Sequence, residues 1–181
     1  MTAGLVLAAG EGRRFGGPKA PYVHDGVRLV DRAVAVLRDA GCSPVLVVLG
    51  AWVGEVPGAV VVENDEWPSG MGSSLRAGLE ALSAYDEVDR AVVTLVDLPG
   101  LTAAAVRRVT DVAVPEPRRQ LAAATYDGRR GHPVLLGRAH WDEIASTASG
   151  DHGAREYLSS HDVTGVEVSD LASGEDLDVR P

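Results

Sequence analysis

Lysine is nearly absent from this 181-residue sequence: of its 17 basic residues only Lys19 is a lysine. Acidic residues number 26, so the formal net charge is −9, which disfavours non-specific binding to nucleic acid. The single Cys42 excludes an internal disulfide framework and is typical of a reducing cytosol. No apolar run approaches the ~20 residues of a membrane span, and no basic residue precedes the apolar stretch 3–9 as in a signal peptide. We therefore expect a cytoplasmic protein that binds neither nucleic acid nor membranes.

Strand-like and helix-like runs alternate along the chain, which predicts an α/β fold. Short apolar runs, two of them strongly β-branched, are typical of strands buried on both faces of a parallel sheet. These predicted strands are residues 4–9, 44–50, 59–64 and 91–97. Apolar residues at helical spacing predict helices over residues 29–40, 73–85 and 101–112, with Ser73 as the N-cap of the second.

The pattern changes after residue 117. Residues 121–137 are predicted to form two antiparallel strands joined by a turn at 127–131. Two short helical segments and one more strand follow, and no linker or internal repeat is evident. We expect residues 1–181 to form a single domain, with a mostly parallel sheet that includes some antiparallel strands.

A glycine-rich loop, LAAGEGRRFGGPK, follows the first predicted strand. Ligands of such folds bind at the carboxyl ends of the strands, and glycines let backbone N–H groups approach phosphate oxygens. Arg13, Arg14 and Lys19 supply local positive charge in an acidic chain. The loop therefore favours an anion site, although a flexible surface loop with solvated charges would have a similar composition.

Two common phosphate-binding motifs do not fit this loop. A dinucleotide fingerprint requires glycine where the chain has Phe15. A P-loop requires Gly-Lys-Ser/Thr, but Pro18 separates Gly17 from Lys19, and Ala20 replaces the hydroxyl residue.

The loop resembles instead the L-A-A-G-x-G-x-R-x-G-x-P-K signature of the molybdenum-cofactor nucleotidyltransferases, the molybdopterin cytidylyl- and guanylyltransferases. The resemblance implies a Rossmann-like three-layer nucleotidyltransferase fold with helices on both faces of the sheet. In that family the loop wraps the nucleoside triphosphate, with Arg14 and Lys19 as the charged phosphate contacts. The residues implied for nucleotide binding here are Leu7, Ala8, Ala9, Gly10, Gly12, Arg14 and Lys19.

A second stretch, NDEWPSGMGSSL at residues 64–75, resembles the family motif N-x-x-W-x-x-G-M-G-S-S-L. A glycine loop at a helix N-terminus offers N–H groups and hydroxyls that suit a nucleotide base and ribose. A turn followed by a helix cap would explain one of the serines. The resemblance implies nucleotide contacts from Asn64, Gly72, Ser73 and Ser74.

An acidic residue, Asp97, ends the strand 91–97 and precedes Leu98-Pro99. Such a residue is often only a turn former, but the segment resembles the family's D-x-P, in which the aspartate binds Mg²⁺. The tail EDLDVRP resembles the family's D-[IL]-D-T-P, which implies Asp176 as a second metal ligand, with Asp178 matching the other aspartate. The tail departs from the family after Asp178, so a solvated acidic tail stays an alternative for Asp176.

Two later stretches, GRRGHPVLLG and SGDHGAREYL, resemble the family motifs G-H-P-V-L and G-D-x-G-A-R. They imply acceptor contacts from His132, Asp151 and Arg155, with Arg130 nearby. His132 as a hydrogen-bonded edge-strand residue and Arg155 as a helix surface charge are the structural alternatives.

The resemblance implies nucleotidyl transfer, in which an acceptor phosphate attacks the α-phosphorus of a nucleoside triphosphate and pyrophosphate leaves. Arg14, Lys19 and Asp97 would be the catalytic residues and Mg²⁺ the cofactor. Ala9, in LAAG rather than LAGG, favours CTP over GTP. Molybdopterin, another phosphorylated small molecule and a sugar 1-phosphate stay open as acceptors. A non-catalytic nucleotide-binding partner or chaperone of a molybdoenzyme is the main alternative, and an NAD-dependent dehydrogenase is disfavoured by Phe15.

Overall fold

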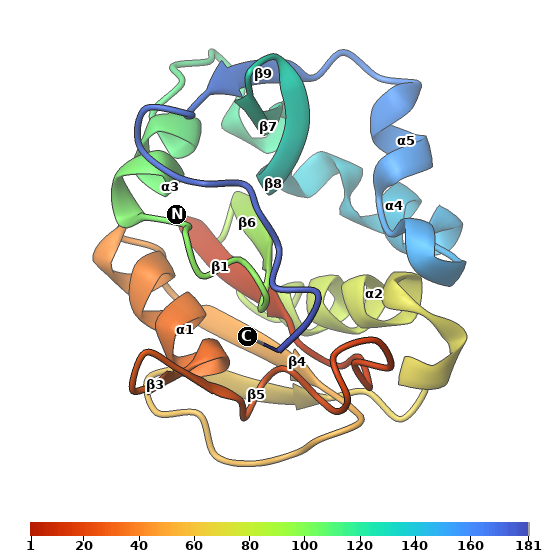
Figure 1. Cartoon of the computed structure of the whole chain (residues 1–181). Helices are drawn as coiled ribbons and strands as arrows, with labels where there is room; N and C mark the ends of the chain where they lie inside the picture. The colour runs from red at the N-terminus through yellow and green to blue at the C-terminus, as the bar shows by residue number, and fades with distance from the viewer. Residues whose placement is uncertain (181) are drawn as a thin grey trace.

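A seven-stranded mixed sheet forms the centre of the protein in the computed structural model, which describes residues 1–180 (Figure 1). Its strands are β1 (Thr2–Leu7), β4 (Val45–Leu49), β5 (Val60–Glu63), β6 (Arg90–Leu95), β7 (Leu121–Tyr126), β8 (Arg129–Gly137) and β9 (Thr164–Glu167). They are ordered β5-β4-β1-β6-β8-β7-β9, and β2 (Val23–His24) pairs with β3 (Val27–Arg28) in a separate small hairpin. Strand β8 runs antiparallel to β6 and β7, whereas the other neighbours in the large sheet pair in parallel.

Helices cover both faces of the sheet because the central strands are apolar on both sides. Along β1, Leu5 and Val6 are fully buried in different hydrophobic clusters, as the alternation of side chains in a strand requires. Helices α1 (Leu29–Asp39) and α3 (Ala103–Thr110) pack on the side of Val6. Helices α2 (Met71–Leu82), α4 (Trp141–Thr147) and α5 (Arg155–Ser159) pack on the side of Leu5. Figure 1 shows these two groups on opposite sides of the sheet, so the predicted three-layer α/β fold is confirmed.

Short 3₁₀ turns connect several of these elements: η1 (Trp67–Ser69), η2 (Pro117–Arg119), η3 (Arg138–His140) and η4 (Gly150–His152). Every predicted strand and helix is present within a few residues of its expected bounds. The predicted start of α2 was wrong. The helix begins at Met71 with Gly70 as its N-cap residue, and the Ser73 hydroxyl instead donates to the carbonyl oxygens of Glu66 and Gly70 at 3.0 and 2.9 Å.

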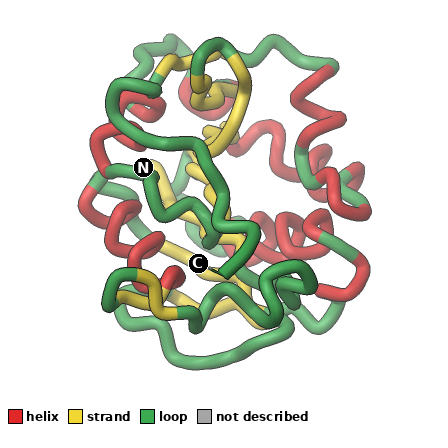
Figure 2. The backbone as a smooth tube through the Cα atoms, viewed as in Figure 1, coloured by secondary structure: helices red, strands yellow, loops and turns green. Residues whose placement is uncertain are grey.

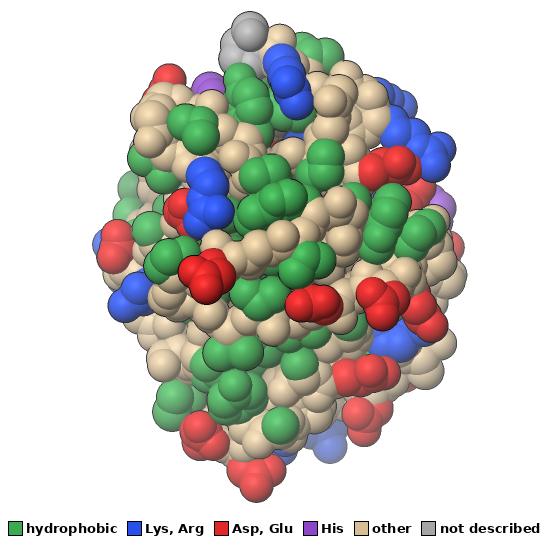
Figure 3. Space-filling view, turned by 90° about the horizontal axis from the view of Figure 1, so that it is seen from below, with side chains coloured by type: hydrophobic (Ala, Val, Ile, Leu, Met, Phe, Trp, Pro, Cys, Tyr) green, Lys and Arg blue, Asp and Glu red, His purple; other side chains and the backbone are tan. Residues whose placement is uncertain are grey.

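The loops that follow β1, β4 and β6 lie at the same end of the sheet because these strands run in parallel, and Figure 2 shows loop segments gathered beside the C-terminus. Seen from below, acidic side chains are spread among hydrophobic and neutral ones over the surface (Figure 3). None of the helices in residues 1–180 is both long and apolar enough to cross a membrane.

A single carboxylate, Glu167, ties the β7–β8 turn to the segment after β9. It accepts hydrogen bonds from the Ser169 hydroxyl, from the backbone N–H of Gly128 at 3.1 Å and from the Thr125 hydroxyl at 2.8 Å. These hydrogen bonds, that of Ser169 first, lower the Glu167 pKa from 4.5 to about 2. The stabilisation is therefore fully present above pH 4.5 and is lost as the pH falls towards 2.

Glu167→Gln is expected to lower the melting temperature at pH 7. The difference in melting temperature between this variant and the wild type should shrink as the pH falls from 4.5 towards 2. Thermal unfolding across this pH range measures the difference. Glu175→Gln, which neutralises another exposed glutamate, is the matched control. A difference in melting temperature that stays constant with pH would contradict the lowered pKa of Glu167.

Candidate active site

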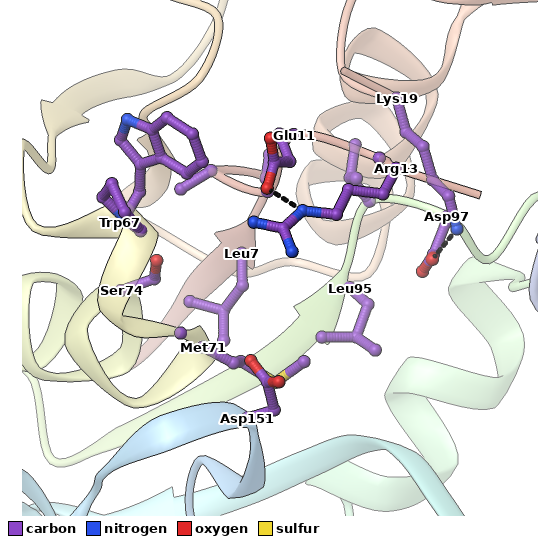
Figure 4. A pocket seen from close by; sticks show the side chains of 17 residues that line it. Leu7, Glu11, Arg13, Lys19, Trp67, Met71, Ser74, Leu95, Asp97 and Asp151 are labelled. Carbon is purple, nitrogen blue, oxygen red and sulfur yellow. Dashed lines mark hydrogen bonds and ion pairs between the residues drawn. The ribbon is translucent and has the colours of Figure 1, made fainter. Parts of the chain in front are cut away.

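A cavity of about 450 Å³ opens at the carboxyl ends of β1 and β6, where the glycine-rich loop meets the N-terminus of α2 (Figure 4). In Figure 4, Trp67 and Ser74 lie on one side of this nucleotide-sized cavity, and Lys19 and Asp97 lie on the other. The sequence-predicted residues that line it are Leu7, Ala8, Ala9, Gly10, Gly12, Lys19, Ser74, Asp97 and Asp151. Trp67, Met71, Glu11 and Arg13 also line it and were not among the predicted site residues.

Lys19 and Asp97 form the charged centre of this cavity. The Lys19 Nζ atom lies 2.6 Å from Asp97 Oδ2, and the two side chains are only 15% and 17% exposed. A third group comes from the C-terminal tail, where Asp178 Oδ1 lies 3.6 Å from the same Nζ atom. Because the Lys19–Asp97 pair is largely screened from water, each charge depends on its partner more than in an ordinary surface pair.

Asp97 carries a carboxylate oxygen that would suit a divalent cation. Its Oδ1 atom is buried and has no hydrogen-bond partner among the described residues, which is costly unless a ligand uses that oxygen. In residues 1–180 no three His, Cys, Asp or Glu side chains form a ready metal cluster. A hard cation such as Mg²⁺ commonly takes one or two carboxylates and completes its shell with phosphate oxygens and water, so Asp97 suffices as an anchor.

The two C-terminal aspartates occupy different positions relative to this centre. Both are exposed: Asp178 approaches Lys19, as described above, and Asp176 lies one residue before Leu177. The tail is held here because the Leu177 N–H donates to the Asp97 carbonyl oxygen at 2.9 Å. The resemblance had singled out Asp176 as the second metal ligand, but the structure brings Asp178 nearest to the charged centre.

Only one of the two arginines of the glycine-rich loop lines the cavity. Both side chains are exposed, but Arg13 lines the cavity and bonds to Glu11, whereas Arg14, the predicted phosphate contact, is not a lining residue. Gly12 has a φ of +63°, and a β-carbon there would lie 2.0 Å from the Gly17 carbonyl oxygen. Only glycine permits this tight turn, so the loop conformation follows directly from the sequence.

Asn64 and the α2 N-terminus form a hydrogen-bonded layer beneath the cavity. The Asn64 amide donates to the hydroxyls of Ser73 and Ser74 at 2.9 and 3.1 Å, and all three side chains are buried. Of these three residues Ser74 lines the cavity, and Trp67 lies over the same side. A β-carbon on Gly50 would lie 2.6 Å from Trp67, so this glycine makes room for the indole ring.

The glycines before and inside α2 allow a second loop to approach the cavity. A β-carbon on Gly72 would lie 2.6 Å from the Ser149 backbone nitrogen, and one on Gly70 would lie 2.5 Å from Gly150. These contacts bring η4, and with it Asp151, against the start of α2. Gly72, predicted to touch the nucleotide, is buried and is required for this packing.

A second cavity of about 500 Å³ adjoins the first, and Leu7, Met71 and Asp151 line both. Leucine and valine side chains form part of its wall, and charged and polar groups from β8 and the η4–α5 segment form much of the rest. All three predicted acceptor residues, His132, Asp151 and Arg155, line this second cavity together with Arg130. Burial lowers the pKa of the His132 imidazole, and the Asp97 carboxylate partly opposes that shift.

The fold is that of a known class. Residues 4–165 match the family model of the MobA-like NTP transferase domain. This protein therefore belongs to the MobA-like nucleotidyltransferase family, as the sequence motifs indicated.

Several members of the family are similar over nearly the whole chain. Nicotine blue oxidoreductase from Paenarthrobacter nicotinovorans is 38% identical, covering 98% of this chain and 92% of that protein. A probable molybdenum cofactor guanylyltransferase from Mycobacterium ulcerans is 29% identical over 94% of this chain and 85% of its own. The crystal structure of Rv0371c from Mycobacterium tuberculosis superimposes with a TM-score of 0.80 at 26% identity, covering 98% and 93% of the two chains. A second structure of Rv0371c is a complex with manganese, with a TM-score of 0.74 at 26% identity over 92% and 88% of the chains.

Proposed function

We propose that this protein is a metal-dependent nucleotidyltransferase that transfers a nucleoside monophosphate from a triphosphate to a phosphorylated small molecule. The observation that carries the proposal is the Lys19–Asp97 ion pair in the cavity beside the glycine-rich loop. The ammonium group of Lys19 can bind phosphate, and one carboxylate oxygen of Asp97 has no hydrogen-bond partner among the described residues. In-line transfer between two phosphates needs no protein nucleophile, so positioning and charge neutralisation are the main tasks of the site.

Each group in the first cavity has a role in this proposal. Lys19 binds phosphate oxygens and stabilises the departing pyrophosphate, and Arg13 or Arg14 adds positive charge from the loop. Asp97 holds Mg²⁺, which would neutralise charge on the phosphates during transfer. The base lies towards Trp67 and Ser74, on the side opposite Lys19 (Figure 4). Asn64 and Ser73 position Ser74 from below through their hydrogen bonds.

CTP is the proposed donor, and GTP is the alternative. Ala9 is buried and lines the cavity, so its methyl group occupies space beside the bound nucleotide. The family resemblance associates this alanine with the cytidylyl members, whereas the Mycobacterium ulcerans relative is named a guanylyltransferase.

The acceptor occupies the second cavity, where Arg130, Arg155 and His132 would contact its phosphate. A molybdopterin-like molecule, with its flat ring against the apolar wall, fits this lining.

Thermal unfolding with CTP, GTP, UTP and ATP, each with and without Mg²⁺, tests the donor. A ligand at a hundredfold excess over its dissociation constant stabilises the native state by about 2.7 kcal/mol. We expect the largest Mg²⁺-dependent shift with CTP, and pyrophosphate release when a phosphorylated acceptor is added. Binding without release from any tested acceptor would favour the non-catalytic nucleotide-binding partner, and no binding would overturn the proposal.

An oxidoreductase is the second candidate, because the Paenarthrobacter relative with that name is 38% identical over 98% of this chain. Such an activity requires an electron donor in one cavity and an oxidised substrate in the other. NADH and NADPH in the same unfolding experiment distinguish the two candidates. Stabilisation by a reduced nicotinamide nucleotide, with none by a triphosphate and Mg²⁺, would favour the oxidoreductase.

A further inference from the structure

The C-terminal segment after β9 runs across the carboxyl ends of the strands and ends beside the glycine-rich loop (Figure 1). We call residues 168–180 the C-terminal strap. It runs in the opposite direction to the β6–α3 connection and is joined to it by three hydrogen bonds of 2.9 to 3.3 Å. These join Thr102 to Leu171, Gly100 to Ser173 and Asp97 to Leu177.

The last described residue, Arg180, contacts the glycine-rich loop itself. Its guanidinium lies 5.2 Å from the centroid of the Phe15 ring and 5.5 Å from that of Tyr22. The two rings pack edge to face at 4.7 Å, and Phe15 is only 3% exposed. Arg180 Nη2 also donates to the Gly16 carbonyl oxygen at 3.3 Å. Arginine can stack on a ring and donate from its edge at once, which lysine cannot reproduce.

The strap therefore joins the two chain segments that carry the charged centre. The last four residues of the strap make these contacts: Leu177 donates to the Asp97 carbonyl oxygen, Asp178 approaches Lys19, and Arg180 holds the loop that contains Lys19. Gly12 and Gly16 have positive φ angles, and a β-carbon on Gly16 would touch nothing within 4 Å. The N–H groups of Gly16 and Gly17 bond to the Gly12 carbonyl oxygen, so these turn hydrogen bonds are local, and the contacts at Phe15 are what hold the glycine-rich turn against the strap.

We propose that Arg180 is a positioning residue that holds the glycine-rich loop in its phosphate-binding conformation. It acts through Phe15 and the Gly16 carbonyl group and does not itself touch the nucleotide. The predicted effect of Arg180 on nucleotide affinity depends on the proposed function. The predicted effect of Arg180 on the loop conformation does not.

The rate of limited trypsin digestion measures opening of the loop directly, because Arg13 and Arg14 provide exposed cleavage sites within it. Arg180→Ala is expected to accelerate cleavage after Arg13 or Arg14 about fivefold or more, since proteolysis follows the population of the open loop. Arg180→Lys should restore part of the protection. Arg129→Ala, which removes an exposed arginine from the β7–β8 turn, is the matched control and should leave the rate unchanged.

Mass-spectrometric mapping separates loop opening from general unfolding. Faster cleavage confined to the loop supports the proposal, whereas equal acceleration after Arg76 and Arg138 would mean general destabilisation and overturn it. Unchanged cleavage in Arg180→Ala would also overturn it.

A titration with CTP and Mg²⁺ then measures the functional consequence. Arg180→Ala should raise the dissociation constant about fivefold, and saturating nucleotide should restore protection of the loop. Unaltered affinity in a variant with an opened loop would contradict the positioning role. If the wild type binds no triphosphate, the proposed function fails, while the digestion still decides whether Arg180 holds the loop.

Discussion

Lys19→Met is expected to weaken triphosphate binding about 10- to 100-fold, the cost of one or two charge-assisted hydrogen bonds in a shielded site. Methionine keeps much of the length and apolar volume of the lysine stem, so the change chiefly removes the charge. The same variant should bind Mn²⁺ more tightly in the absence of nucleotide, because Lys19 Nζ lies 2.6 Å from Asp97 Oδ2 and competes with a cation for that carboxylate.

Isothermal titration with CTP and, separately, with Mn²⁺ measures both changes. Arg129→Met is the matched control, because it also exchanges a cation for methionine but at an exposed residue outside both cavities. Weakened binding of both ligands would indicate that Lys19 supports the fold of the site. Undiminished triphosphate affinity would contradict the phosphate-binding role of Lys19.

Asp97→Asn is expected to abolish the Mg²⁺-dependent part of nucleotide binding and to lower the rate of transfer by about 100-fold or more. Asparagine has nearly the same shape, but it removes the negative charge that attracts a cation and pairs with Lys19. Nucleotide titrations with and without Mg²⁺ measure the first effect, and pyrophosphate release with an active acceptor measures the second. Circular dichroism should remain that of the wild type.

The two tail aspartates provide paired controls for this experiment. Asp178→Asn should reduce the Mg²⁺ dependence if the aspartate nearest Lys19 assists the metal. Asp176→Asn should have this effect if the motif resemblance identifies the ligand correctly. An Asp97→Asn protein that retains full Mg²⁺ dependence would exclude Asp97 as the metal ligand.

The fold was predictable because its signals are local. A strand buried on both faces is mainly apolar: β4 is apolar throughout, and β1 and β6 are apolar apart from their first residues and Thr94. A strand at the edge of the sheet, such as β5, tolerates exposed residues such as Val60. The positions of Lys19 and Asp97 were also predictable, since each follows a central strand whose carboxyl end faces the same crevice.

Details of the site that depend on side-chain direction were not predictable. Arg13 and Arg14 are neighbours in an irregular loop, and no periodicity indicates which of them faces the cavity. Ser73 and Ser74 both follow a glycine loop, but they lie about 100° apart around α2, and only Ser74 faces the cavity. Arg180 gave no sequence signal, because its partner Phe15 is 165 residues away in the chain.

The shared wall of the two cavities has a consequence for the end of a reaction cycle. Leu7, Met71 and Asp151 border both cavities, so the two lie side by side. In the proposed reaction, a product that joins a nucleotide to an acceptor would occupy both cavities at once, and each half would raise the effective concentration of the other. The proposed function therefore predicts slow release of this product.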